Sequence, residues 1–364
     1  MLKRYISYDV KGVIAGAVLG LHSILLCVSC SKASLPAQQA VIQWDISSSD
    51  LQGTKALIGT YTDLRDACTQ DEDGAEKIGV FGAYTYEGTT EHIFEDADLW
   101  WWEKEDGNPF NDPLGDQSYW NYEGEGKYWV DGSDYRFRAY FPKSKVTLQP
   151  GSGVDRFLVV YDSQLAQHDM MVASRTLKAA SENPVKLIFS HTLAAIRFTY
   201  IFAESGVSDR LTACWLENAE ATGFYTSSTL NYESSILWPE STPNPVGSRM
   251  YYWAPVNPMT ITSGAAATAY KSAATAGNGD IYTDNDGWIL TIPQTLKGPE
   301  SLKLCFTTET GGSEVFSVGL PEVSLKPGYR HTFNIKISST SIDLKLSIAE
   351  WNERDSHHHI DFNE

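Results

Sequence analysis

Short runs of alternating apolar and polar residues dominate the chain, whereas long stretches with helical periodicity are scarce. β-branched and aromatic residues are frequent in these runs, and Gly, Pro, Asn and Asp bound them, which is typical of half-buried strands. We expect strands at residues 41–46, 78–86, 135–141, 157–161, 185–189, 195–202, 288–292, 302–307, 331–337 and 342–348. Many short strands separated by turn residues predict an all-β fold built from β-sandwiches.

Few short helices are expected. Residues 61–68 predict a couple of helical turns, and the Ala-rich residues 264–276 predict either a helix or a flexible surface excursion bounded by glycines. The polar stretch 181–184 contains a proline and interrupts the strand pattern. We therefore predict an N-terminal domain at 67–184, a C-terminal domain at 185–351 and a polar tail at 352–364.

The first 29 residues predict an export signal. A basic start is followed by an apolar stretch, and small residues then precede Cys30, which is the pattern of a cleaved lipoprotein leader. A retained transmembrane anchor is the alternative. The apolar stretch barely reaches the roughly 18 residues that a span needs, and no basic stop-transfer cluster follows it. We expect residues 1–29 to be removed and Cys30 to be the lipidated first residue.

The composition narrows the possible partners. The net charge of the 364 residues is −18, and removal of the leader leaves 25 basic against 45 acidic residues, a net charge of −20. Such a surface repels nucleic acid and anionic headgroups, so the lipid alone would hold the protein at a membrane. Cys68, Cys214 and Cys305 remain after processing. Three distant cysteines cannot form a closed disulfide framework, and we expect buried thiols.

No motif in the sequence indicates catalysis. The spacings of serine hydrolases, dinucleotide-binding loops, P-loops and zinc proteases are missing, so we expect neither an enzyme nor a cofactor or metal. We interpret His191 as a structural histidine and His357–His359 as part of a solvated tail. Trp100, Trp101 and Trp102 precede several carboxylates and have three interpretations: core or interface packing, glycan stacking, or a glycosidase site.

Several stretches carry a family resemblance through their order and spacing. They are TKA at 54–56, IGVFGAY at 78–84, WNY at 120–122, KYW at 127–129, FRAYFP at 137–142, DMMVA at 169–173, VKLIFSHTL at 185–193, LKPGY at 325–329 and IAEW at 348–351. Together they resemble the fimbrillin family of Bacteroidetes, the lipoprotein-sorted pilins and their surface relatives. The resemblance implies two tandem transthyretin-like β-sandwich domains with Greek-key-type connections, and export to the outer membrane as a lipidated precursor.

In pilin members of that family, a protease cuts after a basic residue and removes the first strand, and the groove then accepts a strand from the next subunit. Here the removable strand would be Val41, Ile42, Trp44 and Ile46, within a lipidated N-terminal segment at 30–66. The candidate cutting sites are Arg65, which we slightly favour, and Lys55. If both are ordinary surface charges, the protein keeps its first strand.

Near the C-terminus, Ile342, Leu344, Leu346 and Ile348 share one face of an expected strand. This strand is either donated to a neighbour or is the last strand of its own domain. The resemblance implies a structural, adhesive fimbrial subunit that assembles head-to-tail by strand exchange with other subunits, at the cell surface or in a fimbria. The alternative is a non-polymerising outer-membrane lipoprotein that binds glycans or proteins of host or bacterial surfaces, the glycans through Trp100–Trp102.

Overall fold

The computed structural model describes residues 40–48, 61–69, 75–103, 118–122, 125–221, 223–270 and 286–351. These residues are almost entirely strands, with one short helix among them, α1 (Tyr61–Ala67). The predicted all-β class and the predicted helical turns near residue 61 are therefore confirmed. Residues from Ala40 onward form one compact unit. The helix found here is too short and too polar to cross a membrane.

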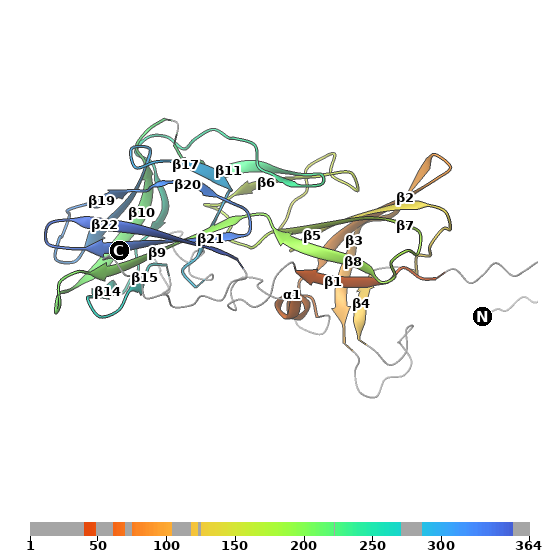
Figure 1. Ribbon diagram of the computed structural model, residues 1–364, viewed down its shortest axis with the longest axis horizontal. Helices are drawn as coiled ribbons and strands as arrows, with labels where there is room; N and C mark the ends of the chain where they lie inside the picture. The colour runs from red at the N-terminus through yellow and green to blue at the C-terminus, as the bar shows by residue number, and fades with distance from the viewer. Residues whose placement is uncertain are drawn as a thin grey trace, which may run out of the picture. The chain divides into compact units, whose positions relative to one another are not determined.

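A seven-stranded sheet contains most of the N-terminal strands, in the order β1-β8-β7-β5-β2-β3-β4. Its members are β1 (Trp44–Ser48), β2 (Ile78–Tyr86), β3 (Thr89–Trp102), β4 (Tyr119–Tyr122), β5 (Asp134–Phe141), β7 (Met171–Lys178) and β8 (Val185–His191). Every pairing is antiparallel except that of β1 with β8. Figure 1 shows β1 alongside β8, although the two strands are far apart in the sequence.

Local sequence explains why these segments form strands. In β8, Val185, Leu187 and Phe189 are buried, whereas Lys186 and Ile188 between them are exposed. This period of two matches a pleated strand with one face on a core. The hairpin between β2 and β3 turns at Glu87 and Gly88, both with positive φ (49° and 82°), as the tight hairpin turns that fit the twist of the strands require.

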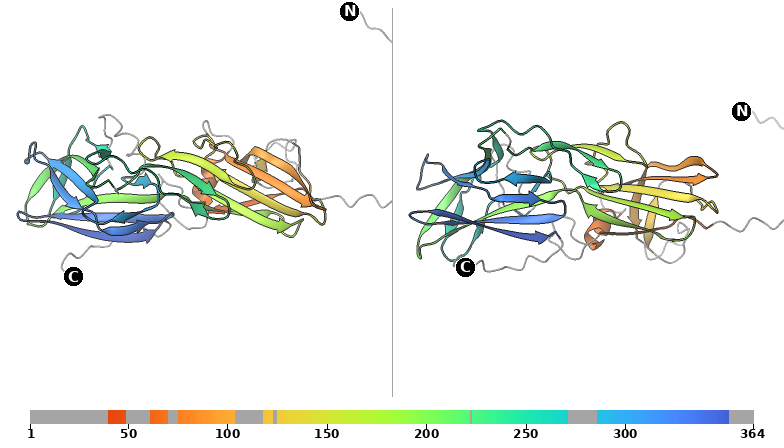
Figure 2. Two further views of the ribbon diagram at one scale, coloured as in Figure 1. Left: turned by 90° about the horizontal axis from the view of Figure 1, so that it is seen from above. Right: turned by 45° about the horizontal axis from the view of Figure 1, so that its top comes forward.

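The C-terminal strands form two larger sheets and two smaller ones. The first has the order β13-β10-β18-β19, and β14 also pairs with β10; the second has the order β15-β9-β21-β22, and β16 also pairs with β9. Their bounds are β9 (Ala194–Phe202), β10 (Ser208–Asn218), β13 (Arg249–Trp253), β14 (Met259–Thr262), β15 (Ala267–Thr268), β16 (Ile289–Thr291), β18 (Leu302–Thr308), β19 (Phe316–Gly319), β21 (Tyr329–Ile337) and β22 (Ile342–Glu350). Figure 2 shows β9 in green beside β21 and β22 in blue, as the pairing requires.

The smaller sheets are β12-β11-β6 and β17-β20. Their bounds are β6 (Phe157–Asp162), β11 (Ser227–Tyr232), β12 (Ile236–Leu237), β17 (Gln294–Lys297) and β20 (Glu322–Leu325). Residues 264–276 were expected to form a helix or a flexible surface excursion, but Ala267, Ala269 and Tyr270, in the described part, pack in the C-terminal core. β15 pairs with β9, and Ala269 and Tyr270 are buried, because these residues complete the apolar core beside Phe198 and Trp253.

The strand that follows the predicted domain boundary belongs to the seven-stranded sheet. Val185–His191 forms β8, which pairs with β1 and β7 of that sheet; the domain boundary between 184 and 185 stays a prediction. In the opposite sense, β6 of the N-terminal half pairs with β11. Which strands pair depends on which apolar faces meet in the core. Pro184 interrupts the strand pattern, but β7 before it and β8 after it belong to the same sheet. The division into two transthyretin-like domains stays a prediction.

Three large apolar clusters form the interior. One lies on the inner face of the seven-stranded sheet, a second lies within the C-terminal sheets, and a third gathers residues of both parts. The third contains Tyr140 of β5, Val172 of β7, Leu230 of β11 and Leu290 of β16, so it packs the two halves of the compact unit against each other. Cys68, Cys214 and Cys305 are free and buried, as expected, and burial raises the pKa of the Cys305 thiol to about 11.

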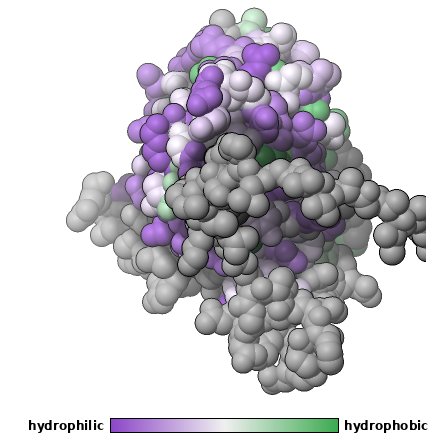
Figure 3. Space-filling model, turned by 90° about the vertical axis from the view of Figure 1, so that its right-hand side faces the viewer, coloured by the Kyte–Doolittle hydropathy of each residue, from purple (hydrophilic) through white to green (hydrophobic). Residues whose placement is uncertain are grey.

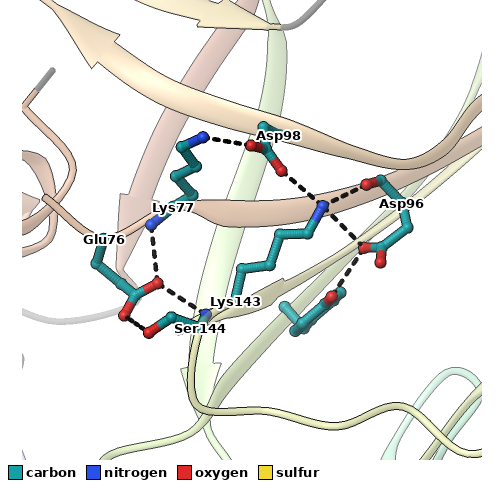
Figure 4. A network of polar contacts seen from close by, with 7 residues as sticks. Glu76, Lys77, Asp96, Asp98, Lys143 and Ser144 are labelled. Atoms are coloured by element: carbon teal, nitrogen blue, oxygen red, sulfur yellow. Dashed lines mark hydrogen bonds and ion pairs between the residues drawn. The ribbon is translucent and has the colours of Figure 1, made fainter.

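A polar network on the seven-stranded sheet fixes the chain that follows β5 (Figure 4). The Lys143 ammonium lies 2.6 Å from Asp98 Oδ1 and also donates to the Asp96 carbonyl. Lys77 donates to the other oxygen of Asp98 at 2.5 Å, and the Tyr140 hydroxyl donates to Asp96 Oδ1 at 2.7 Å. Burial acts to raise the pKa of Asp98, but the bonds from Lys143 and Lys77 outweigh it, and the pKa lies below its usual value.

Candidate functional site: the seam closed by the first strand

Residues 40–48, which end in β1 and which we call the first strand, bury one face and expose the other. Ile42, Trp44 and Ile46 are buried in the apolar core of the seven-stranded sheet, while Gln43 is half-buried and Asp45 is exposed. The alternation that predicted this strand is therefore confirmed. Each large apolar side chain that is buried fully contributes about 1.5–3 kcal/mol to stability, so this short strand is held mainly by three side chains.

Trp44 inserts into a group of aromatic rings. Its ring centroid lies 5.1 Å from that of Phe137, in an edge-on arrangement, and 5.5 Å from that of Phe94. Phe94 in turn meets Tyr122 edge-on at 5.0 Å, and Phe137 lies 6.3 Å from Trp129. We call Phe94, Tyr122, Trp129, Tyr135 and Phe137 the aromatic cluster; it forms the floor on which the first strand lies.

On one side, the backbone of residues 40–48 pairs with β8. The two strands run parallel, with Trp44 opposite Val185 and Ile46 opposite Leu187, and the Val185 amide donates to the Gln43 carbonyl at 2.7 Å. Just before β8, the side chain of Asn183 extends this pairing. It accepts from the Gln43 amide at 2.9 Å and donates to the Val41 carbonyl at 3.0 Å.

On the other side, the same segment bonds to the chain that follows β4. The Ile42 amide donates to the Lys127 carbonyl at 2.8 Å, and the Trp129 amide donates to the Ala40 carbonyl at 3.1 Å, so that Val41 and Tyr128 form an antiparallel bridge. Residues 40–48 thus occupy the gap between β8 and residues 127–129. We call this gap the seam; without its strand, it would expose backbone groups on both sides and an apolar floor between them.

Two tyrosines of the aromatic cluster hold the far side of the seam. The Lys127 amide donates to the Tyr122 hydroxyl at 2.6 Å, and the Val130 amide donates to the Tyr135 hydroxyl at 2.7 Å. Burial raises the pKa of both phenols, so they stay protonated at neutral pH. Residues 127–130 are therefore fixed by contacts that do not involve the first strand and would persist after its removal.

The helix α1 covers the same core and contains one of the two predicted cutting sites. Leu64 and Cys68 are buried in the core, and the Cys68 carbonyl accepts from the Trp101 amide at 2.9 Å. Arg65 bonds to Asp66 at 2.8 Å, and its guanidinium lies 5.8 Å from the Trp101 ring centroid. The peptide bond after Arg65 is therefore part of a packed helix. Lys55, the other predicted site, lies outside the described residues.

The predicted donor strand is the last strand of its own sheet. β22 pairs with β21 from Ile337–Ile342 to Tyr329–Glu350. Ile342, Leu344 and Leu346 are partly buried against the C-terminal core, whereas Ile348 is 51% exposed. Of the two interpretations left open by the sequence, this structure contains the second. Donation to a neighbour stays a prediction.

Trp351 anchors the end of β22, a contact that the sequence did not reveal. Its ring is buried and stacks on His191 at 4.5 Å, and its amide donates to the Gly328 carbonyl at 2.8 Å. His191 Nδ1 lies 3.0 Å from Asp169. The structural interpretation of His191 agrees with this burial. The partners of His191 come from the residue after β22 and from the chain before β7, and no local pattern could have identified them.

The tryptophans of β3 do not share one face. Trp101 packs against the core and meets Trp120 edge-on at 5.6 Å. Trp100 and Trp102 alternate with it; Lys77 lies 5.8 Å from the Trp100 ring, and Trp102 pairs with Tyr119 at 5.3 Å. Trp101 is thus partly buried against the core, in keeping with the packing interpretation. Glycan binding through Trp100 and Trp102 stays a prediction.

Within the described part of the chain, no group of three or more His, Cys, Asp or Glu side chains could hold a metal ion. The described residues on the face drawn in Figure 3 are mostly hydrophilic, in keeping with the charged composition. The predicted lipidation site, Cys30, lies outside the described residues, as do the leader and the tail.

The chain is similar to a known protein family and to several solved structures. The sequence profile of the fimbrillin-like family matches residues 67–351. A fimbrial protein from Bacteroides vulgatus has a similar structure, with a TM-score of 0.55 at 15% identity, over 85% of this chain and 99% of that one. A candidate cell-adhesion protein from Bacteroides ovatus reaches a TM-score of 0.52 at 15% identity, over 88% and 100%. No curated protein matches the sequence.

Proposed function

The chain belongs to the fimbrillin-like family, and from this premise we propose that it is a structural, adhesive subunit of a surface fimbria. In this proposal the precursor is exported as a lipoprotein through Cys30 and is trimmed by a protease. It then accepts a strand from a neighbouring subunit, head-to-tail. No catalytic step is part of the proposal.

The closure of the seam by residues 40–48 is the observation that carries the proposal. Residues 40–48 are held by three buried side chains, by the pairing of β1 with β8 and by the bonds to residues 127–129. Because β1 stands at the end of the strand order, it can be exchanged without breaking the pairing of the other strands. Its loss would leave unpaired backbone groups on β8 and at residues 127–129, together with the apolar floor. Such an edge favours the addition of another strand, because main-chain hydrogen bonds supply affinity and side-chain pockets supply selectivity.

The surroundings of Arg65 favour Lys55 as the site of trimming. Proteases act on chain that is transiently open, and a cut after Arg65 would require α1 to unfold and Leu64 to leave the core. Lys55 precedes the helix and follows the first strand in the sequence. A cut there separates residues 40–48 from the rest of the chain and leaves α1 intact.

The mass of the protein from native outer membranes tests this proposal. We expect a chain that begins after Lys55 and lacks residues 40–48, because the fimbrial form exchanges that strand. Lys55→Gln should retain the acylated N-terminus, and Cys30→Ala added to Lys55→Gln should remove the lipid mass. Arg65→Gln should be trimmed as in the wild type. Native protein that is full-length from its acylated cysteine, alone and still closed by its own first strand would contradict the proposal.

A further inference from the structure

The position of Trp44 determines which strands fit the seam. Its ring lies between Phe94 and Phe137, and both rings are brought close by the missing side chain at Gly82. A Cβ atom at Gly82 would lie 2.8 Å from the Phe94 ring and 2.9 Å from the Phe137 ring. Phe94 and Phe137, packed over Gly82, therefore form the pocket, and the Trp44 indole that fills it is buried.

A smaller side chain at this position would leave a cavity. Protein interiors are packed to the density of organic crystals, and a void that the surroundings cannot fill is destabilising. Phe94 and Phe137 also contact Tyr122 and Trp129 of the aromatic cluster, so they have little freedom to collapse into the space. An incoming strand therefore needs a large aromatic residue at its central buried position, with branched aliphatic residues two positions before and after it.

The last strand of this chain does not meet that requirement. With Ile342 in the place of Ile42 and Leu346 in the place of Ile46, the central position holds Leu344 instead of Trp44. The same strand is also occupied: it pairs with β21 over its whole length, and Trp351 holds its end on His191. A second copy of this protein is thus a poor donor, both in its side chains and in its accessibility.

We propose that the seam selects a strand with a central aromatic residue, supplied by a different subunit and not by β22 of a second copy. The protein then accepts a strand while β22, the candidate donor among its described strands, stays in its own sheet, and it occupies one end of an assembly. This inference rests on the proposed strand exchange.

Exchange of synthetic peptides into the nicked full-length protein tests the inference. A protease recognition sequence inserted between Ser48 and Tyr61 allows the chain to be cut after folding. Fluorescent peptides then compete for the seam: residues 40–48, the same peptide with Trp44→Ala, and a matched control with the exposed Asp45→Ala. Two further peptides are residues 342–350 and their Leu344→Trp variant. Binding is followed by anisotropy and by native mass spectrometry.

We expect the 40–48 peptide and its Asp45→Ala variant to bind alike, and Trp44→Ala to bind about a hundredfold more weakly or worse, given typical losses for deleting a buried tryptophan. The 342–350 peptide should bind as weakly as Trp44→Ala, and Leu344→Trp should recover at least about tenfold in affinity. Equal binding of the 40–48 and 342–350 peptides, or no effect of Trp44→Ala, would overturn the inference and leave strand exchange standing. Failure of every peptide, including 40–48, to enter the seam would contradict strand exchange itself.

Discussion

At the scale of single residues, the floor of the seam depends on side chains that fit around one another. Phe94 and Phe137 reach Trp44 only because Gly82, on the strand between theirs, has no side chain to hold them apart. Asn183 replaces a strand residue by bonding with its amide group to the backbone at Val41 and Gln43. Small changes at these positions should therefore act on the seam directly.

Gly82→Ala should lower the free energy of unfolding by about 1–3 kcal/mol, the usual range for overpacking a core. The added Cβ would force Phe94 and Phe137 apart. Urea unfolding measures the change, with Gly153→Ala as the control, because a Cβ at Gly153 has no neighbour within 4 Å. Equal stability of the two variants would show that the floor is looser than the structure indicates.

Asp98 should make the protein sensitive to acid. Its pKa is lowered in the folded state by Lys143 and Lys77, against the opposing effect of burial, so the charged carboxylate stabilises the fold. That contribution is complete above the unfolded value of 3.8 and is lost as the pH falls through the lower folded pKa. Asp98→Asn should therefore lose less stability than the wild type between about pH 4 and pH 2 in thermal unfolding.

The control for this measurement is Asp155→Asn, which removes an exposed carboxylate paired with Arg136. Exposed ion pairs contribute little, so this variant should follow the wild-type acid profile. If the Asp98→Asn and Asp155→Asn profiles coincide, the network around Lys143 does not stabilise the charged carboxylate.

At the scale of elements, the two ends of the described chain are held differently. β1 pairs with β8 over its five residues and β22 pairs with β21 over nine, and both strands stand at the end of their strand orders. The buried Trp351 directly follows β22. The packing of α1 protects the peptide bond after Arg65. The longer pairing and the buried tryptophan favour retention of β22, and the shorter pairing of β1 is the one that the proposed exchange would replace.

Trp351→Ala should lower the free energy of unfolding by about 3–5 kcal/mol, as expected for deleting a buried tryptophan. Ile348→Ala, on the same strand but half exposed, should cost less than about 1 kcal/mol. Hydrogen exchange of the β22 amides should increase in the first variant and remain unchanged in the second. A comparable loss in both variants would mean that the stacking on His191 does not anchor the strand.

At the scale of the whole molecule, the acidic composition and the three apolar clusters have separate roles. A net negative charge makes molecules of this protein repel one another. The third apolar cluster, with residues such as Tyr140 and Leu290, packs the two halves of the compact unit together. In the proposed assembly, a load that reaches the seam from the neighbouring subunit would pass through this shared packing to the C-terminal half.

Local patterns in the amino-acid sequence are enough to predict the all-β class, the short helix near residue 61 and the buried face of the first strand. These properties depend on periodicity within a few residues, and the alternation of Ile42, Trp44 and Ile46 is visible in any window that contains them. The burial of Cys214 and Cys305 also follows from the apolar runs in which they lie, whereas Cys68 lies between charged residues and is buried by the packing at the end of α1.

Which strands pair with one another can be seen only in the folded structure. The partner of the first strand is β8, some 140 residues later, and Asn183, Lys127 and Trp129 belong to the seam through contacts that leave no local pattern. The same holds for the stacking of Trp351 on His191 and for the pairing of β8 with β7. Hydrophobic periodicity and turn-forming residues can be recognised within a few neighbouring residues. Strand pairing depends on how the apolar faces of all strands are buried together.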